Sequence, residues 1–259
     1  MKEIIFALIL AVGLFLGMLA CLELGRRLGV RRLRIDPDGV KAGTGAVEGA
    51  IFALLGLLVA FTFSGAASRF DTRRELIVTE ANAIGTAYLR IDVLPTAFQE
   101  PLREDFRRYV EARLKTYRLV SNVQAAKAEL SLATALQKKI WAQAIAATQA
   151  EGAPSSAMML FLPPLNDMFD ITTTRTMSLQ MHPPYVIFGM LCTLALAGAL
   201  LAGNGMAGAR SRSWLHIVGF ALALSLSVFI ILDIEYPRLG LVRVDSFDQA
   251  LVSVRAGMN

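Results

Sequence analysis

Four long apolar runs constrain the fold of this chain more than any other feature of its sequence. They cover residues 4–22, 49–67, 185–203 and 214–232, and none of them contains Asp, Glu, Lys or Arg. An α-helix needs about 20 such residues to cross the ~30 Å hydrocarbon core of a bilayer. Four uncharged runs of this length do not fit into one soluble domain, so we predict an all-α protein with four membrane-spanning helices.

The runs divide the chain into four parts. We predict a first transmembrane hairpin over residues 1–67 with a basic connecting loop at 23–48, an extramembrane α-helical module over 68–184, a second transmembrane hairpin over 185–232, and a C-terminal tail over 233–259 with a short capped helix. Only 18% of the residues are charged, against roughly a quarter in an average soluble protein. This low charge content agrees with a multi-pass membrane protein whose first run is an uncleaved anchor.

The sequence of the central module predicts helices only. Apolar residues recur at helical spacing from Ser68 to Asp92 and again in a later helix that Asn122 can cap. A further helical segment covers about Ser156 to His182. We expect it to break at Pro163 and Pro164, because proline lacks the backbone N–H that a helix needs.

The basic residues bear on the orientation of the chain in the membrane. The loop after the first run carries six Lys and Arg residues between Glu23 and Gly45, and the loop after the third run carries Arg210 and Arg212. The opposite side carries an equal number near the ends of the runs. Because the basic residues of the first loop are dense and the loop is short, the positive-inside rule favours a central module on the outer side of the membrane.

The sequence carries no motif of an enzyme or of a metal site. His182 and His216 are its two histidines, and no HExxH, CxxC, GxSxG or GxxxxGK[ST] pattern occurs. No basic stretch alternates with aromatic residues as in proteins that bind nucleic acid. We therefore predict no enzyme, no catalytic residue, no metal, no cofactor and no nucleic-acid partner, and we expect contact with the lipid bilayer.

The second apolar run carries two different stripes when it is wound at 100° per residue. One stripe consists of small residues, which let helix backbones approach each other closely in lipid: Gly49, Ala53, Gly56, Ala60 and Ala67. The other, which we call the Glu48 stripe, has an acid at one end and arginines at the other: Glu48, Phe52, Leu55, Val59, Thr62, Ala66, Arg69 and Arg73. The Glu48 stripe is either a lipid-facing or packed face with its charged ends in water, or a pore lining with a hydrophobic constriction at Leu55 and Val59.

Charged residues also gather where the second and fourth runs end. This boundary charge cluster comprises Asp71, Arg74, Glu80, Asp233, Glu235 and Arg238. In a four-span topology both ends lie on the same side of the membrane, so ion pairs between them are geometrically allowed. Pairing that fixes the helix ends is the simpler interpretation, and exposed pairs of this kind contribute only ~0–1 kcal/mol each.

Short motifs around the second run and near the end of the chain are familiar from one group of membrane proteins. The motifs are Val47–Ala50, Gly56–Phe61, Arg69–Asp71, Glu80–Thr86 and Leu232–Val244. In these segments the chain resembles the bestrophin-like family of bacterial integral membrane proteins, although Tyr236 stands where many members carry Arg. The resemblance implies four spans per subunit, a homo-oligomer, an anion channel lined by the second span, and a cytosolic central segment, which is the side opposite to the one that the basic residues favour.

Two functions of different classes are consistent with these observations. The first is a homo-oligomeric, bestrophin-like ion channel of the bacterial inner membrane, which conducts a small anion through a pore lined by the second span. The alternative is a non-conducting membrane scaffold or sensor whose helical module binds a protein partner. The alternative would be favoured if the Glu48 stripe packed against other helices and left no water-filled opening along the axis of the oligomer.

Overall fold

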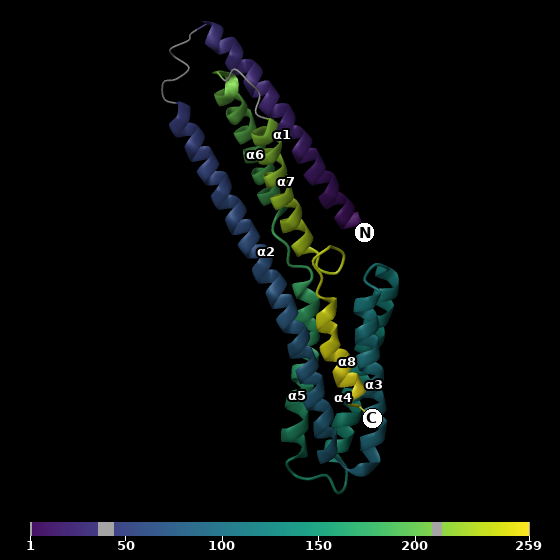
Figure 1. The fold of residues 1–259 in the computed structure, drawn as a ribbon. Coiled ribbons are helices and arrows are strands. Elements are labelled where there is room, and N and C mark those ends of the chain that lie inside the picture. Colours follow the sequence, from purple (N-terminus) through teal and green to yellow (C-terminus); the bar gives the residue numbers. More distant parts are fainter. Residues whose placement is uncertain (1, 36–43, 209–213, 259) are drawn as a thin grey trace. The chain divides into compact units, whose positions relative to one another are not determined.

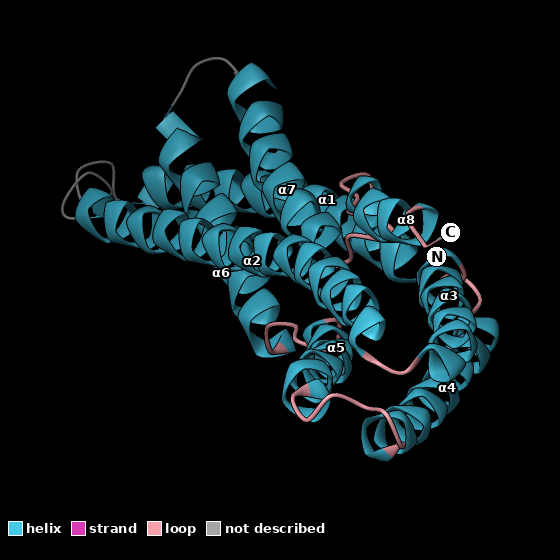
Figure 2. Ribbon diagram, turned by 90° about the horizontal axis from the view of Figure 1, so that it is seen from below, coloured by secondary structure: helices cyan, strands magenta, loops and turns pink. Residues whose placement is uncertain are grey.

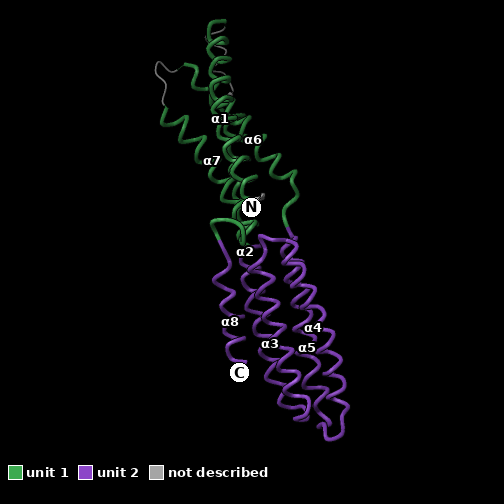
Figure 3. Tube along the Cα trace, turned by 90° about the vertical axis from the view of Figure 1, so that its right-hand side faces the viewer, with its two compact units in different colours: residues 1–68, 182–242 green, residues 69–181, 243–259 purple. Residues whose placement is uncertain are grey.

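The structure is a computed structural model that describes residues 2–35, 44–208 and 214–258. Within these ranges every regular element is a helix, so the predicted all-α class is confirmed (Figure 2). The chain forms two compact units (Figure 3). Unit 1 comprises residues 1–68 and 182–242, and unit 2 comprises residues 69–181 and 243–259.

Unit 1 contains the four helices that are long and apolar enough to cross a membrane, as the sequence predicts. These are α1 (Lys2–Ile35), the first part of α2 (Thr44–Leu89), α6 (Tyr185–Gly205) and α7 (Trp214–Glu235), and a short 3-10 turn, η3 (Met206–Gly208), follows α6. α1 packs along α6 and also contacts α7 (Figure 1). The four predicted spans are therefore all helical in the structure.

α1 continues well beyond the apolar run at residues 4–22. We expected a connecting loop over residues 23–48, whereas α1 continues to Ile35 and α2 begins at Thr44, and residues 36–43 lie outside the described part of the chain, as do 209–213. Glu23 accepts hydrogen bonds from Arg26 at 3.1 Å and from Arg27 at 2.8 Å, one helical turn further along. Such i,i+3 and i,i+4 ion pairs stabilise a helix and allow it to continue past the apolar run.

Glycines bring α1 and α6 close together. A Cβ atom at Gly203 would lie 2.8 Å from the carbonyl carbon of Leu22, and one at Gly25 would lie 2.9 Å from the carbonyl carbon of Leu200. One turn later, a Cβ atom at Gly29 would lie 2.7 Å from the carbonyl oxygen of Asn204. Gly25 and Gly29 form a GxxxG pattern, which is typical of closely packed helices in membranes. A side chain larger than hydrogen at any of these three glycines would therefore disrupt the contact between α1 and α6.

Unit 2 is a bundle of antiparallel helices closed by the end of the chain. It contains the second part of α2, the 3-10 turn η2 (Arg90–Val93), α3 (Thr96–Arg118), α4 (Val123–Gln149), α5 (Ala157–Ser178), the 3-10 turn η4 (Asp245–Asp248) and α8 (Gln249–Ala256). Its core combines buried apolar residues from all five α-helices, among them Ile84, Phe106, Ile140, Phe161 and Leu251. The tail therefore completes the core of unit 2 through α8.

Two local predictions for this unit have different outcomes. The Asn122 side chain accepts a hydrogen bond from the backbone N–H of Ala125 at 3.2 Å, so the predicted cap of α4 is confirmed. The predicted break at Pro163 and Pro164 is wrong, because α5 runs through both prolines. Phe161, Pro164, Leu165 and Met168 are buried at helical spacing, and this packing holds the segment helical in spite of the missing N–H groups.

Candidate pore helix and buried charge network

The first part of α2 turns one side toward its own subunit. Leu55, Thr62 and Ala66 of the Glu48 stripe are buried in unit 1. Phe52 makes an edge-to-face contact with Phe220 of α7, with 5.8 Å between the ring centroids. The middle of the Glu48 stripe therefore packs against helices of the same chain.

The remaining members of the Glu48 stripe differ in their surroundings. Glu48, Phe52, Val59 and Arg69 are partly exposed, so they lie at the edge of the packed face. Arg73, which belongs to unit 2, is buried and donates hydrogen bonds to the backbone oxygens of Ser178 at 3.3 Å and of Met181 at 3.0 Å. Arg73 thus donates to one carbonyl group at the last residue of α5 and to another three residues beyond it. Pore lining by the Glu48 stripe stays a prediction.

The small-residue stripe of α2 lies on the uncovered side of the helix. Gly49, Ala53, Gly56 and Ala60 are exposed, Ala67 is partly exposed, and a Cβ atom at Gly49 or Gly56 would have no described atom within 4 Å. Only 17% of the most apolar window of α2 is buried, compared with 22–33% for the other three spans. α2 is therefore the least buried of the four spans, and no described residue of the same chain packs closely on Gly49 or Gly56.

The boundary charge cluster falls into two groups, one in each unit. In unit 1, the Asp233 carboxylate accepts hydrogen bonds from the backbone N–H groups of Leu241 and Val242, each at 2.8 Å. A Cβ atom at Gly240 would lie 2.7 Å from Cγ of Asp233, so only glycine allows this turn to close. Asp233 thereby holds the segment that follows α7. Glu235 and Arg238 are buried in the same unit.

In unit 2, Asp71 and Arg74 form an exposed pair at 2.9 Å on the surface of α2. Glu80 lies in a different environment, because its side chain is completely buried between Arg113 of α3 and Arg175 of α5. Nε of Arg113 donates to Oε1 of Glu80 at 2.5 Å, and Nη1 of Arg175 donates to Oε2. One carboxylate therefore joins three helices of the bundle.

The buried charge network around Glu80 extends to the tail of the chain. Nη2 of Arg175 donates to Oδ1 of Asp248 at 3.3 Å, and the Arg175 guanidinium lies 3.7 Å from the ring centroid of Tyr117. Nη2 of Arg113 donates to the Tyr117 hydroxyl. The formal charges of Glu80, Asp248 and the two arginines sum to zero. These four charges therefore balance one another, which lowers the cost of burying them in the core of the bundle.

The surroundings of Arg113 determine its ionisation. Burial acts to lower the pKa of its guanidinium, but its neighbours Tyr117 and Glu80 outweigh burial and hold that pKa above its ordinary value. Burial raises the pKa of the nearby Tyr109, whose hydroxyl shares a hydrogen bond of 2.8 Å with the Thr172 hydroxyl. Arg113 therefore stays charged and Tyr109 stays neutral across the physiological pH range.

The sequence analysis did not identify Arg113, Tyr117, Arg175 or Asp248 as members of a site. Arg113 did carry a signal, because it lies four residues from both Tyr109 and Tyr117 on the apolar face of α3. A charged residue on such a face needs a buried partner. Among the residues that the structure describes, no group of three His, Cys, Asp or Glu side chains has the arrangement of a metal site.

Comparison with known families identifies the chain as a whole. The model of the Bestrophin-like domain matches residues 11–246, which include most of the first span, the other three spans, and the helical bundle up to its last helix, α8. The chain belongs to the bestrophin-like family. Comparisons of this bestrophin-like chain with curated proteins and with solved structures found no significant match.

Membership of the bestrophin-like family agrees with the structure in one respect that matters for function. The bestrophin-like chain has four helices able to cross a membrane, so it is a multi-pass membrane protein in contact with lipid. The family is associated with channels. The motif residues Glu48, Arg69 and Glu80, which carry the resemblance in the sequence, all lie on α2.

Proposed function

We propose that the protein forms a homo-oligomeric, anion-selective channel in the bacterial inner membrane, with α2 lining the pore. Family membership supports a channel, and the four spans support its place in the membrane. The proposal includes no catalytic activity. α2 has 46 residues and is therefore ~69 Å long, about twice the hydrocarbon thickness. This length supports a position outside the membrane for unit 2.

The observation that carries the proposal is the uncovered side of α2. Its backbone is accessible along three turns, at Gly49, Ala53, Gly56 and Ala60. In addition, α2 is the least buried of the four spans. Small residues at this spacing allow a second helix to approach closely. Copies of α2 from neighbouring subunits can use this face, and a ring of such helices would enclose an axis.

The exposure of the Glu48 stripe refines which residues are suited to face that axis. Val59 lies at the edge of the packed face and is partly exposed, whereas Phe52 contacts Phe220 and Leu55 is only 2% exposed. We therefore place the hydrophobic constriction at Val59, and we assign Phe52 and Leu55 to packing inside the subunit. Apolar rings of this kind gate channels by dewetting. Arg69, beyond the apolar part of α2, supplies positive charge that attracts anions.

Unitary currents from the purified protein in planar bilayers test this proposal. Val59→Ser makes the constriction more polar and should raise the conductance or the open probability. Val218→Ser is the matched control, because Val218 is an exposed valine on α7. We expect its currents to equal those of the wild type. Silent bilayers from a folded oligomer of the wild type would overturn the channel proposal.

The alternative is a non-conducting scaffold or sensor whose helical unit binds a protein partner. One observation favours it, namely the packing of Leu55, Thr62 and Ala66 inside the subunit instead of toward an opening. Arg73 is likewise engaged with the end of α5. The bilayer measurement separates the two functions, since a scaffold would give a folded oligomer without currents and without an effect of Val59→Ser.

A further inference from the structure

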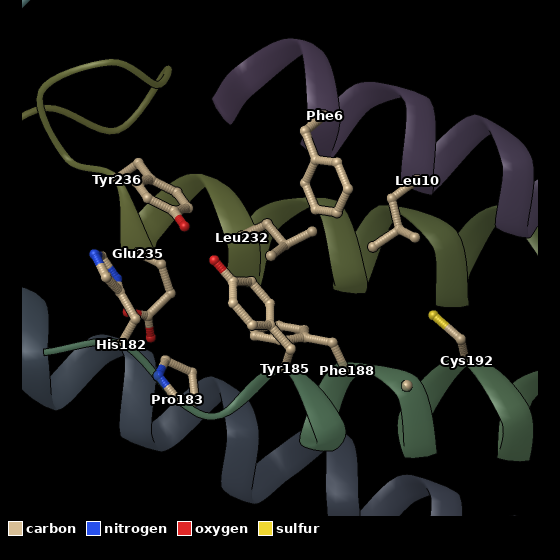
Figure 4. Close-up of a pocket in the computed structure, with 11 residues that line it drawn as sticks. Phe6, Leu10, His182, Pro183, Tyr185, Phe188, Cys192, Leu232, Glu235 and Tyr236 are labelled. Carbon is tan, nitrogen blue, oxygen red and sulfur yellow. The ribbon is translucent and has the colours of Figure 1, made fainter. Parts of the chain in front are cut away.

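Cavities lie at both ends of the helices α1, α6 and α7 in unit 1. One lies at the start of α6 and the end of α7, and Figure 4 shows the side chains that line it. The acid of this cavity, Glu235, is only 1% exposed, so its charge is withdrawn from solvent. The other cavity, which we call the Arg27 cavity, lies at the opposite ends of these helices, has a volume of about 460 Å³ and carries exposed charge.

The Arg27 cavity has an apolar part and a charged part. Leu19 and Leu22 of α1 and Ile217 of α7 provide apolar walls. Arg26 and Arg27, about one turn further along α1, provide the charged wall. A ligand that covers both parts must therefore combine an apolar portion with a charged group.

This order of walls matches the edge of a bilayer. The cavity is lined by Leu22, the last residue of the first uncharged run, by Gly203, the last of the third, and by Trp214, the first of the fourth. Three spans therefore end at the cavity. Tryptophan is enriched at the interface between membrane and water. The apolar part thus lies at the depth of the acyl chains and the charged part at the depth of the headgroups.

The arginines at the cavity share one carboxylate. Arg26 donates to Glu23 through Nε at 3.1 Å and through Nη2 at 3.2 Å, and Arg27 donates to Glu23 through Nε at 2.8 Å. The formal charges of the three side chains sum to +1. In the part of the chain that the structure describes, Arg27 donates through Nε alone, and its side chain is 70% exposed. Both Nη groups of Arg27 can therefore donate to a ligand while Nε stays on Glu23.

The other charges at this end of unit 1 do not reverse the positive sign. α6, η3 and residues 214–232 of α7 contain no Asp, Glu, Lys or Arg. Residues 23–48 and 204–213, which connect the spans here, contain eight basic and four acidic residues. The nearby acid of α2, Glu48, lies beside Gly205, 3.4 Å from where a Cβ atom there would be, and does not line the cavity. The cavity therefore attracts an anion.

The volume of the Arg27 cavity admits part of a lipid. It falls within the range of roughly 300–1,000 Å³ that is typical of pockets for small molecules. A phosphate-bearing headgroup and the first part of its acyl chains fit this space, and the rest of the chains stays in the surrounding bilayer. A free phosphate would leave the apolar walls uncovered, so the shape favours a lipid.

We propose that the Arg27 cavity binds an anionic phospholipid of the bilayer. The phosphate accepts hydrogen bonds from the two Nη groups of Arg27, and the acyl chains lie against Leu19 and Ile217. A guanidinium group offers two parallel donors that match a phosphate, and basic pockets between transmembrane helices bind anionic headgroups for this reason. The site is formed within one chain, so the inference goes beyond the proposed channel and depends neither on the oligomeric state nor on ion conduction.

Native mass spectrometry of the full chain in detergent, with lipid added at increasing concentration, tests the choice of headgroup. The wild type should bind phosphatidylglycerol, which carries a net negative charge, more tightly than the zwitterionic phosphatidylethanolamine. Equal binding of the two lipids by the wild type would overturn the proposal.

Two arginine variants test the position of the site. Arg27→Gln should bind phosphatidylglycerol about fivefold more weakly than the wild type, which is the factor that corresponds to ~1 kcal/mol per basic residue at an anionic lipid surface. Arg32→Gln is the matched control, because Arg32 is an exposed arginine of the same helix that lies about 140° around its axis from Arg27 and does not line the cavity. Equal binding by the two variants would overturn the role given to Arg27.

Circular dichroism establishes that both variants keep their helices, as the similar helix propensities of glutamine and arginine lead us to expect. If Arg27→Gln is not folded, the lipid preference of the wild type decides alone.

Glycerol 3-phosphate distinguishes a lipid from a free phosphate compound, since it carries a phosphate group without acyl chains. Added in excess, it should leave phosphatidylglycerol bound to the wild type, because it cannot cover the apolar walls. Displacement of the lipid by glycerol 3-phosphate would overturn the lipid as the occupant of the cavity.

Discussion

Replacement of Glu80 by Gln probes the buried charge network more directly than any other substitution. The Glu80 and Arg113 side chains are fully buried and the Arg175 side chain is 3% exposed, so water cannot take over the role of the carboxylate. Glu80→Gln preserves the shape of the side chain and removes its charge. Arg113 then loses its carboxylate partner, whereas Arg175 keeps Asp248 at 3.3 Å. The variant therefore leaves a net positive charge in the core of unit 2.

The size of the effect follows from the two contacts that Glu80 makes. At an effective dielectric constant of ~20, each pair at ~4 Å contributes ~4 kcal/mol, and the cost of desolvating the charges offsets part of the sum. Loss of one partner of a buried pair costs ~3–5 kcal/mol. For a chain of this size, 1 kcal/mol lowers the unfolding midpoint by ~2–4 °C. We therefore expect Glu80→Gln to lower the midpoint by roughly 6–20 °C.

Thermal unfolding of the purified protein in detergent, followed by circular dichroism, measures this shift. Asp71→Asn is the control, because Asp71 lies on the same helix and its pair with Arg74 at 2.9 Å is exposed. Exposed pairs contribute ~0–1 kcal/mol, so the control should shift the midpoint by no more than ~4 °C. Equal shifts for Glu80→Gln and Asp71→Asn would refute the reasoning that the buried network holds the bundle together.

Three further predictions concern packing, the turn after α7 and orientation. Gly203→Ala should destabilise the protein by ~1–3 kcal/mol, because its methyl group would overlap α1, whereas Gly219→Ala should leave the unfolding midpoint within about 2 °C of the wild type. Asp233→Asn weakens two charge-assisted hydrogen bonds to the backbone and should speed amide hydrogen exchange in the turn after Gly240, while the exposed Asp245→Asn should not change that exchange. The density of basic residues in the first loop predicts that alkaline phosphatase fused to the C-terminus is active; an inactive phosphatase with a fluorescent cytosolic reporter would contradict that orientation.

The fold could be predicted from the sequence because of the apolar runs. A run such as 185–203, with no charged residue, has few alternatives to a helix in a bilayer, since every backbone polar group must be satisfied within the segment. The structure places α6 at Tyr185–Gly205, close to this range. The length of α1 and the continuous α5 were missed because local pairs at Glu23 and core packing at Phe161 outweigh the loop signals of the sequence.

The candidate site could be predicted only in part. Helical periodicity showed which residues of α2 share a face, but it did not show what that face contacts, because lipid, a pore and a packed helix all accept the same apolar side chains. For example, Leu55 and Gly56 are adjacent in sequence, but Leu55 is buried and Gly56 is exposed. The partners of Glu80 lie 33 and 95 residues further along the chain, a separation that no local pattern reports.

The reversal potential of unitary currents under a chloride gradient tests the central claim most directly. The wild-type oligomer in a planar bilayer should conduct, and its reversal potential should lie close to the equilibrium potential of chloride, because an anion-selective pore lined by α2 excludes the cation. A folded oligomer that gives no current, or a current that reverses at the equilibrium potential of the cation, would contradict the account.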